Sequence, residues 1–105
     1  MNEKQEELKE KVINVIKKVY DPELPVNIYE LGLIYDIKIT EQNEVVVLMT
    51  LTAPNCPEAE SIPAQVEYNI RHLHDVKDAK VLLTFDPPWD RDKLSDVAKI
   101  ELGLF

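Results

Sequence analysis

The fold is decided by the stretch Val45-Val46-Val47-Leu48-Met49-Thr50-Leu51-Thr52-Ala53-Pro54-Asn55-Cys56-Pro57. It begins as the most apolar run of the chain and carries consecutive β-branched residues without a charge, which is typical of a strand buried on both faces. Pro54 ends the strand, because proline cannot donate to a strand ladder. Pro57 suits the first position of a helix, so we expect a helix to begin there, with the single cysteine, Cys56, beside its N-cap.

The segments on both sides of the turn 41–43 predict an antiparallel hairpin. Before the turn, Leu33 to Thr40 alternates between apolar and polar residues, and its apolar face carries Tyr35, Ile37 and Ile39. After the turn, the strand from Glu44 to Thr52 returns along the first. A connection this short joins neighbouring strands that run in opposite directions.

A helix and a third strand follow the cysteine. Apolar residues recur at helical spacing from Ala59 to Leu73, although Pro63 lies within the pattern. An interior proline removes a hydrogen bond, so we expect either a bent helix or a first turn that restarts at Pro63. Ala79 to Phe85 then alternates as a strand. We expect this strand–helix–strand connection to be a right-handed crossover, with the third strand parallel to the second, so that both strands end at one edge of the sheet.

The N-terminal part of the chain predicts a helix and a structured turn. Glu3 to Tyr20 carries one apolar stripe at helical spacing among charged residues. The helix ends at Asp21-Pro22, because the residue before a proline avoids helical angles. The loop that follows is rich in apolar residues, so we expect it to pack on the body. Within it, Gly32 closes a short helical turn over Asn27 to Leu31.

The C-terminal segment completes an α+β fold. A last helical segment runs from about Arg91 to Leu102, with a potential break at Ser95 and Gly103 as its stop. The order of elements is α-β-β-α-β-α. We therefore expect a compact two-layer domain with a small three-stranded mixed sheet, made of an antiparallel hairpin plus one parallel strand, and with the helices packed on it.

Composition narrows the class of protein. With 105 residues, 45% of them hydrophobic and 30% charged, the chain is expected to form one soluble domain over residues 1–105. The net charge of −8 argues against a nucleic-acid partner, because phosphate backbones bind clustered lysine and arginine. A single cysteine excludes an internal disulfide, the first residues are too charged for a signal peptide, and no apolar run suits a membrane span. We expect a cytoplasmic protein without a membrane partner.

Cys56 is the residue best placed for chemistry. A helix N-terminus stabilises a thiolate, but Glu58 and Glu60 oppose this effect. The two histidines, His72 and His74, lie about 20 Å away along the expected helix, so no Cys–His pair is expected within one chain. A closed zinc or iron–sulfur site takes about four thiolate or imidazole ligands, whereas this chain has one thiol. A reactive thiol and a small structural cysteine both remain open.

Three segments of the chain resemble signatures of the iron–sulfur cluster assembly (FSCA) domain-like family. Members of this family are metal–sulfur cluster biosynthetic proteins, and the resemblance is to its SufT-like members. The first is the opening Asp21-Pro22-Glu23-Leu24-Pro25 and its continuation to Tyr35, the second is the cysteine loop Met49 to Pro57, and the third is Phe85-Asp86-Pro87-Pro88-Trp89. The resemblance covers nearly the whole chain. It implies the same α-β-β-α-β-α domain.

The resemblance also implies a function and a site. The implied role is an accessory one in iron–sulfur protein maturation, by delivering clusters or by bringing recipient apo-proteins to the assembly machinery, with a cluster held transiently and none tightly bound. Cys56 matches the reactive cysteine of the family and is the implied transient ligand. Its functional-loop neighbours are Asp21 and Glu23 of the acidic loop, Thr52 and Asn55 of the cysteine loop, and Trp89. We expect these three segments to form one contiguous surface.

Two alternatives remain beside this interpretation. In the first, the protein is a pure protein–protein adaptor in which Cys56 is structural and the acidic surface recruits recipients. In the second, it is a thiol-redox enzyme that uses Cys56 as a nucleophile, although the chain lacks a resolving cysteine. In the favoured interpretation it is not an enzyme in the turnover sense. A homodimer is expected because a shared cluster needs thiolates from more than one chain.

Overall fold

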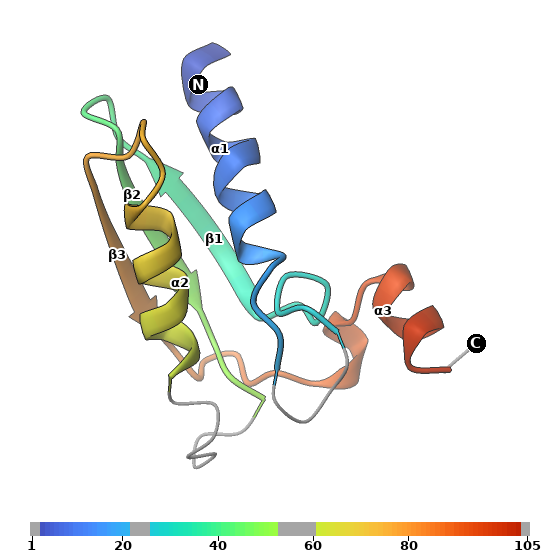
Figure 1. Cartoon of the computed structure of the whole chain (residues 1–105). Coiled ribbons are helices and arrows are strands. Elements are labelled where there is room, and N and C mark those ends of the chain that lie inside the picture. Colours follow the sequence, from blue (N-terminus) through green and yellow to red (C-terminus); the bar gives the residue numbers. More distant parts are fainter. Residues whose placement is uncertain (1–2, 22–25, 53–60, 104–105) are drawn as a thin grey trace.

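A computed structural model describes residues 3–21, 26–52 and 61–103 of the chain. The elements are α1 (Glu3–Ile16), β1 (Ile34–Ile39), β2 (Glu44–Met49), α2 (Ile62–Arg71), β3 (Asp78–Leu83), the 3-10 helix η2 (Arg91–Lys93) and α3 (Asp96–Glu101). Their order confirms the expected α-β-β-α-β-α fold (Figure 1).

The sheet has the expected mixed topology, with strand order β1-β2-β3. β1 and β2 are antiparallel, with Ile37 opposite Val47, and β2 and β3 are parallel, with Val47 opposite Val81. The turn between β1 and β2 is closed at Asn43, which has a positive φ of 62°. Because β2 and β3 are parallel, their C-terminal ends lie at the same edge of the sheet.

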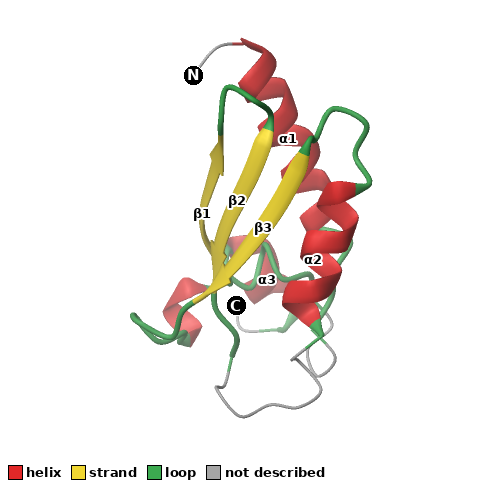
Figure 2. Ribbon diagram, turned by 90° about the vertical axis from the view of Figure 1, so that its left-hand side faces the viewer, coloured by secondary structure: helices red, strands yellow, loops and turns green. Residues whose placement is uncertain are grey.

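α1 and α2 pack on one face of the sheet, and no described segment covers the other face (Figures 1 and 2). The core between the layers includes Leu8, Val12 and Ile16 of α1, Val45, Val47 and Met49 of β2, and Ile62, Val66 and Ile70 of α2. The expectation that β2 is buried on both faces is therefore wrong. Its alternate residues Val46 and Leu48 are only half-buried, because they lie on the open face.

A bulge in β1 corrects the expected face of Tyr35. The register with β2 shifts between Ile34 and Asp36, so that Tyr35 is the extra residue of the strand. Ile37 and Ile39 face the core as expected, and Ile34 rather than Tyr35 joins them there. A bulge redirects a side chain and adds local twist. Here the Tyr35 hydroxyl donates to the carbonyl oxygen of Pro87, at 2.7 Å.

The start of α2 differs from the expected one. α2 begins at Ile62 with Ser61 as its N-cap and Pro63 in its first turn, which confirms a restart at Pro63 rather than a bend. Proline fits there because N–H groups of the first turn have no helical partner. The expected N-cap position of Cys56 is wrong for this helix, because Cys56 precedes Ser61 by five positions; residues 53–60 lie outside the described part of the chain.

The break expected in the last helical segment is confirmed. η2 ends at Lys93 and α3 starts at Asp96, with Ser95 as an extended N-cap between them. The Ser95 hydroxyl accepts a hydrogen bond from the backbone N–H of Ala98, at 3.1 Å. A serine N-cap satisfies a helix N–H that has no other partner.

The end of α1 differs from the expected one, because the helix ends at Ile16, before Asp21-Pro22.

Gly32 is required at the end of the turn that precedes β1. Its φ is +81°, and a Cβ atom there would collide with the backbone carbonyl oxygen of Lys93. We expect Gly32→Ala to lower the free energy of unfolding by about 2 to 4 kcal/mol, because left-handed strain and steric overlap add. Urea unfolding measures this change. Gly103→Ala is the matched control.

Gly103 shares the positive φ, at +73°, but nothing lies within 4 Å of its Cβ position. Its replacement by alanine should therefore cost only about 1 kcal/mol, the conformational penalty alone. Equal effects of the two substitutions would show that the contact between Gly32 and Lys93 does not constrain the fold.

Candidate functional site

The candidate site lies at the end of the molecule where β2 and β3 terminate. There the backbone N–H of Thr84 donates to the carbonyl oxygen of Met49 at 2.9 Å, and the N–H of Thr50 donates to that of Leu33 at 2.8 Å. These bonds tie the exits of β2 and β3 to the entry of β1. The stem of the cysteine loop is therefore held by main-chain bonds to both neighbouring strands.

Trp89 is fixed on the turn that follows the acidic loop. Its indole Nε1–H donates to the carbonyl oxygen of Leu31 at 2.6 Å, and its ring packs against the core. A second bond joins the same two regions, from the Ser95 N–H to the carbonyl oxygen of Glu30 at 2.9 Å. The Trp89 segment and the 27–32 turn thus form one unit, although they lie far apart in the sequence.

Asp21 and Thr52 are the other described residues of the expected site. Asp21 follows the end of α1 and is only 6% exposed, whereas Thr52 is half-buried after the exit of β2. An antiparallel bridge between Tyr20 and Asn27 closes the acidic loop at its base. Glu23, Asn55 and Cys56 lie outside the described residues, so a surface shared by all three segments stays a prediction.

Sequence reasoning missed two residues that support this end of the molecule. Thr50 is fully buried directly after β2, and its hydroxyl donates to the carbonyl oxygen of Leu51 at 3.4 Å. A polar residue inside an apolar run was the available signal. Lys93 contributes the carbonyl group beside Gly32 and places its ammonium group 5.4 Å from the centre of the Tyr35 ring. The contact between Lys93 and Tyr35 depends on the bulge in β1, so no sequence pattern indicated it.

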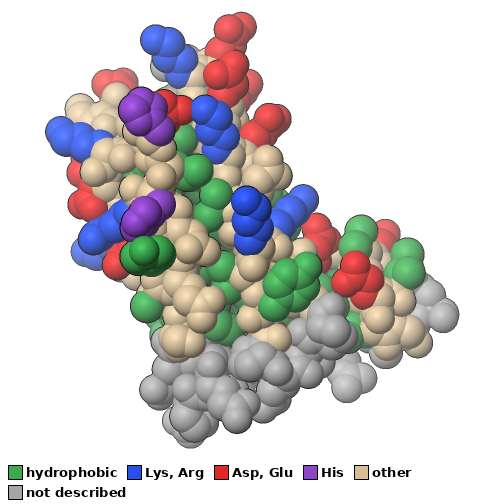
Figure 3. All heavy atoms as spheres, in the orientation of Figure 1, with side chains coloured by type: hydrophobic (Ala, Val, Ile, Leu, Met, Phe, Trp, Pro, Cys, Tyr) green, Lys and Arg blue, Asp and Glu red, His purple; other side chains and the backbone are tan. Residues whose placement is uncertain are grey.

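The charged side chains form no single-sign patch on the face seen in Figure 3, where acidic and basic groups are interspersed. The ion pair between Lys11 and Asp75, at 2.7 Å, lies at the opposite end of the sheet from the candidate site. Their hydrogen bond, and then their opposite charges, raise the pKa of Lys11 and lower the pKa of Asp75. Both side chains are about half exposed, so the pair contributes little to stability.

Within residues 3–21, 26–52 and 61–103, no three His, Cys, Asp or Glu side chains are grouped so that they could hold a metal ion. Over the same ranges, no helix has the length and apolar character that crossing a bilayer requires.

Comparison with known proteins decides the family. The family model described as iron–sulfur cluster assembly protein matches residues 9–83, which include β1, β2, α2, β3 and the cysteine loop. The chain belongs to this family. The match ends before the segment 85–89 that contains Trp89.

Two relatives of the family align over nearly their full length. A Fe-S protein maturation auxiliary factor of Porphyromonas gingivalis is 44% identical over 103 residues, which are 98% of each chain. The Fe-S protein maturation auxiliary factor YitW of Bacillus subtilis is 43% identical over 100 residues, 95% of this chain and 98% of the relative.

A solved structure shares the fold. The crystal structure of a domain of unknown function from Bacillus anthracis superposes with a TM-score of 0.86 at 36% identity and covers 95% of both chains. The family fold therefore extends over the C-terminal segment that carries Trp89.

The bond from Trp89 to Leu31 offers a direct test of how the site is held together. We expect Trp89→Phe to lower the free energy of unfolding by about 1 to 3 kcal/mol, because the buried Leu31 carbonyl loses its donor while most of the ring is kept. Thermal or urea unfolding reports the change. Tyr35→Phe removes the exposed bond to Pro87 and should cost less than about 1 kcal/mol. A larger loss of unfolding free energy from Tyr35→Phe than from Trp89→Phe would contradict this prediction.

Proposed function

We propose that this protein is an accessory factor of iron–sulfur cluster assembly, which helps to deliver or insert clusters into recipient apo-proteins. The observation that carries the proposal is the near-full-length likeness to two Fe-S protein maturation auxiliary factors at 43 and 44% identity. The cluster is the cargo of this process. The factor acts by contact and is not an enzyme in the turnover sense.

In this proposal Cys56 ligates the cluster transiently as a thiolate. Iron–sulfur clusters are held by cysteine thiolates, and Cys56 is the single thiol of the chain. Support comes from the described stem of its loop, which is tied to β1 and β3 by the main-chain bonds of Thr50 and Met49. Such a stem fixes where the loop leaves the sheet. The side chains of Asp21, Thr52 and Trp89 would then border the cargo, together with Glu23 and Asn55.

The partners follow from the same role. They are the iron–sulfur assembly machinery, recipient apo-proteins and a second copy of the chain, which supplies another thiolate. The factor works in the cytoplasm and binds neither nucleic acid nor membranes. The mixed charges on the face in Figure 3 agree with protein partners, because nucleic-acid binding needs clustered cations.

The rival candidate is a pure adaptor that recruits recipients without touching the cluster. Both roles need the same fold, but the adaptor does not need the Cys56 thiol. A thiol-redox enzyme is the weaker rival, because a peroxidatic cysteine is normally paired with a resolving one.

The proposal is tested by comparing cells that lack the protein with cells that contain it. We measure the activity of a cluster-dependent dehydratase, the abundance of its polypeptide and the activity of an iron-independent enzyme as control. The proposal expects the dehydratase activity to fall several-fold in cells without the protein, while the abundance of its polypeptide and the activity of the iron-independent enzyme stay constant. Unchanged dehydratase activity in these cells, under iron limitation as well as with ample iron, would overturn it.

A further inference from the structure

The outer edge of β3 is an edge of the sheet, because the strand order places β3 last (Figure 2). Along such a strand, the backbone groups of alternate residues point toward the neighbouring strand or away from it. The N–H of Thr84 donates to Met49 of β2, whereas the carbonyl oxygen of Ala79 accepts from Arg71 on the other side. The residues whose backbone groups point away from β2 are therefore Ala79, Val81 and Leu83.

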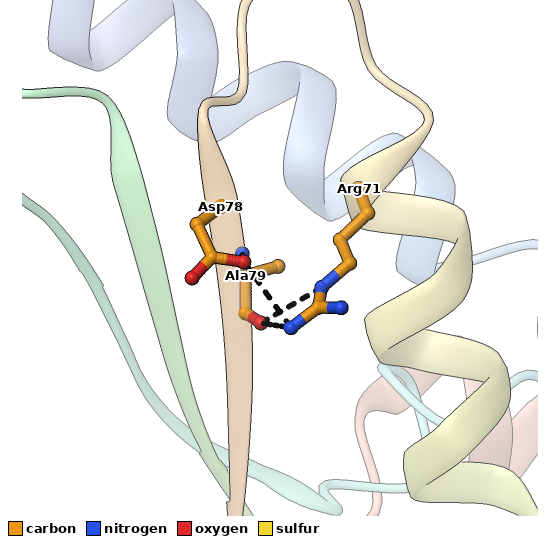
Figure 4. A network of polar contacts seen from close by, with 3 residues as sticks. All are labelled: Arg71, Asp78 and Ala79. Carbon is orange, nitrogen blue, oxygen red and sulfur yellow. Dashed lines mark hydrogen bonds and ion pairs between the residues drawn. The ribbon is translucent and has the colours of Figure 1, made fainter.

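At the first of these three positions, Ala79, the outward backbone groups already have hydrogen-bond partners within the chain, as Figure 4 shows. The guanidinium of Arg71 donates to the carbonyl oxygen of Ala79 from Nε at 3.2 Å and from Nη2 at 3.0 Å. The N–H of Ala79 donates to a carboxylate oxygen of Asp78 at 2.9 Å. Asp78 and Arg71 also form an ion pair at 3.1 Å. Both edge groups of Ala79 are thus satisfied.

The other two positions are open. Among the described residues, none forms a hydrogen bond with the outward N–H or carbonyl groups of Val81 and Leu83. Beyond them the chain turns away, because the Thr84 hydroxyl accepts from the N–H of Asp86 at 3.2 Å. The open stretch is therefore three residues long, with Arg71 at one end and the Thr84 turn at the other. Its middle residue, Leu82, is 42% exposed on the open face of the sheet, and Leu83 is 45% exposed.

We propose that two copies of this chain pair through this open stretch, antiparallel, about a two-fold axis at Leu82. Val81 then lies opposite Leu83 of the second copy, and Leu83 lies opposite Val81 of the second copy. Each pair exchanges two main-chain hydrogen bonds, because all the groups involved point outward. The three-stranded sheets of the two copies join into one six-stranded sheet. This proposal names the surface of the homodimer in the proposed function and rests on that role.

Three features favour a second copy over a strand from another protein. The first is length: β3 of the second copy turns away at Thr84, before it would meet Arg71, whereas a longer strand would collide with that side chain. The second is apolar contact, since the two exposed Leu82 side chains face each other across the axis. The third is charge, since Lys80 lies opposite Thr84 and no like charges meet. A two-fold interface needs this kind of self-complementarity.

The pairing places the two candidate sites on one assembly. Met49 lies level with Leu83, one residue beyond the axis in each copy. With strands about 4.8 Å apart and a rise of about 3.3 Å per residue, the C-terminal ends of the two β2 strands would lie roughly 16 Å apart.

Disulfide trapping tests the pairing in the full-length chain. In a Cys56→Ser background, Leu82→Cys places two thiols opposite each other at a Cα separation of about 4.5 Å, within the range that a disulfide spans. Lys80→Cys is the matched control, because it lies on the same face of the same strand but its two copies are about 14 Å apart. We expect Leu82→Cys to form a covalent homodimer at least tenfold faster. Equal rates would overturn the pairing.

Sedimentation of unmodified and charge-changed proteins gives a second readout. The original chain should dimerise in a concentration-dependent way, Leu82→Lys and Leu82→Glu should each be monomeric, and an equal mixture of the two should dimerise again. Circular dichroism confirms that each variant is folded. A monomeric original chain at all concentrations, or Leu82→Cys that cross-links to a recipient protein and not to itself, would overturn the proposal. Neither outcome bears on the dehydratase assay, which tests the accessory role separately.

Discussion

Replacing Cys56 by serine is expected to abolish support of cluster maturation while leaving the fold intact. Serine keeps the size of cysteine but removes the thiolate that soft cluster iron prefers. The fold should keep its free energy of unfolding within about 1 kcal/mol, because serine is close to cysteine in volume and α2 begins only at Ile62, after the cysteine loop. Complementation of a strain that lacks the gene measures function, and urea unfolding measures stability.

Ser61→Ala is the matched control, since it alters a small polar residue close in sequence whose side chain makes no cap hydrogen bond. It should restore cluster-dependent growth fully. If Cys56→Ser unfolds, the cysteine is structural. If it folds, accumulates normally and complements fully, the adaptor alternative is correct and the thiolate role is wrong.

Any cluster on the purified protein is expected to be shared between two chains and easily lost. A [2Fe–2S] cluster ordinarily takes four thiolates, and each chain offers one, so a small thiol, a carboxylate or a recipient cysteine must fill the remaining positions. Anaerobic reconstitution with an added small thiol should give about one iron per chain on a dimer, since two irons are divided between two chains. Native mass and iron analysis measure this stoichiometry.

Leaving out the small thiol should reduce the iron content strongly, and a mild chelator should remove the cluster within minutes. Cys56→Ser, reconstituted in parallel, should retain no cluster and thereby separates specific binding from adventitious iron. A monomer that holds a stable, complete cluster would contradict this account, because one thiol cannot supply its ligands.

The topology could be predicted because each connection leaves few choices. A three-residue turn between the alternating segment and the apolar run that follows it favours a hairpin, and the helical crossover connection then favours a β3 that runs parallel to β2. The burial of β2 was overestimated for a physical reason. Its apolar run suggests two buried faces, yet Val46 and Leu48 lie on a face that no described segment covers. An apolar run cannot distinguish full burial from an exposed apolar face.

Local details were harder to predict because they depend on contacts between distant segments. The bulge at Tyr35 is visible only when β1 is aligned with β2, and it allows the bond to Pro87. The bond of Trp89 joins residues 58 positions apart, so no local pattern contains it. For the site, the resemblance identified candidate residues, whereas the described geometry shows how Trp89 is anchored and how the exit of β2 is held.

The most direct test of the central claim follows radioactive iron into a recipient protein in growing cells. Cells with and without this protein are labelled under iron limitation, a tagged cluster-containing recipient is isolated, and the iron per recipient polypeptide is counted. The account predicts a several-fold lower iron content without the protein, restored by the original chain and not by Cys56→Ser. Equal iron content in all these cells would contradict it.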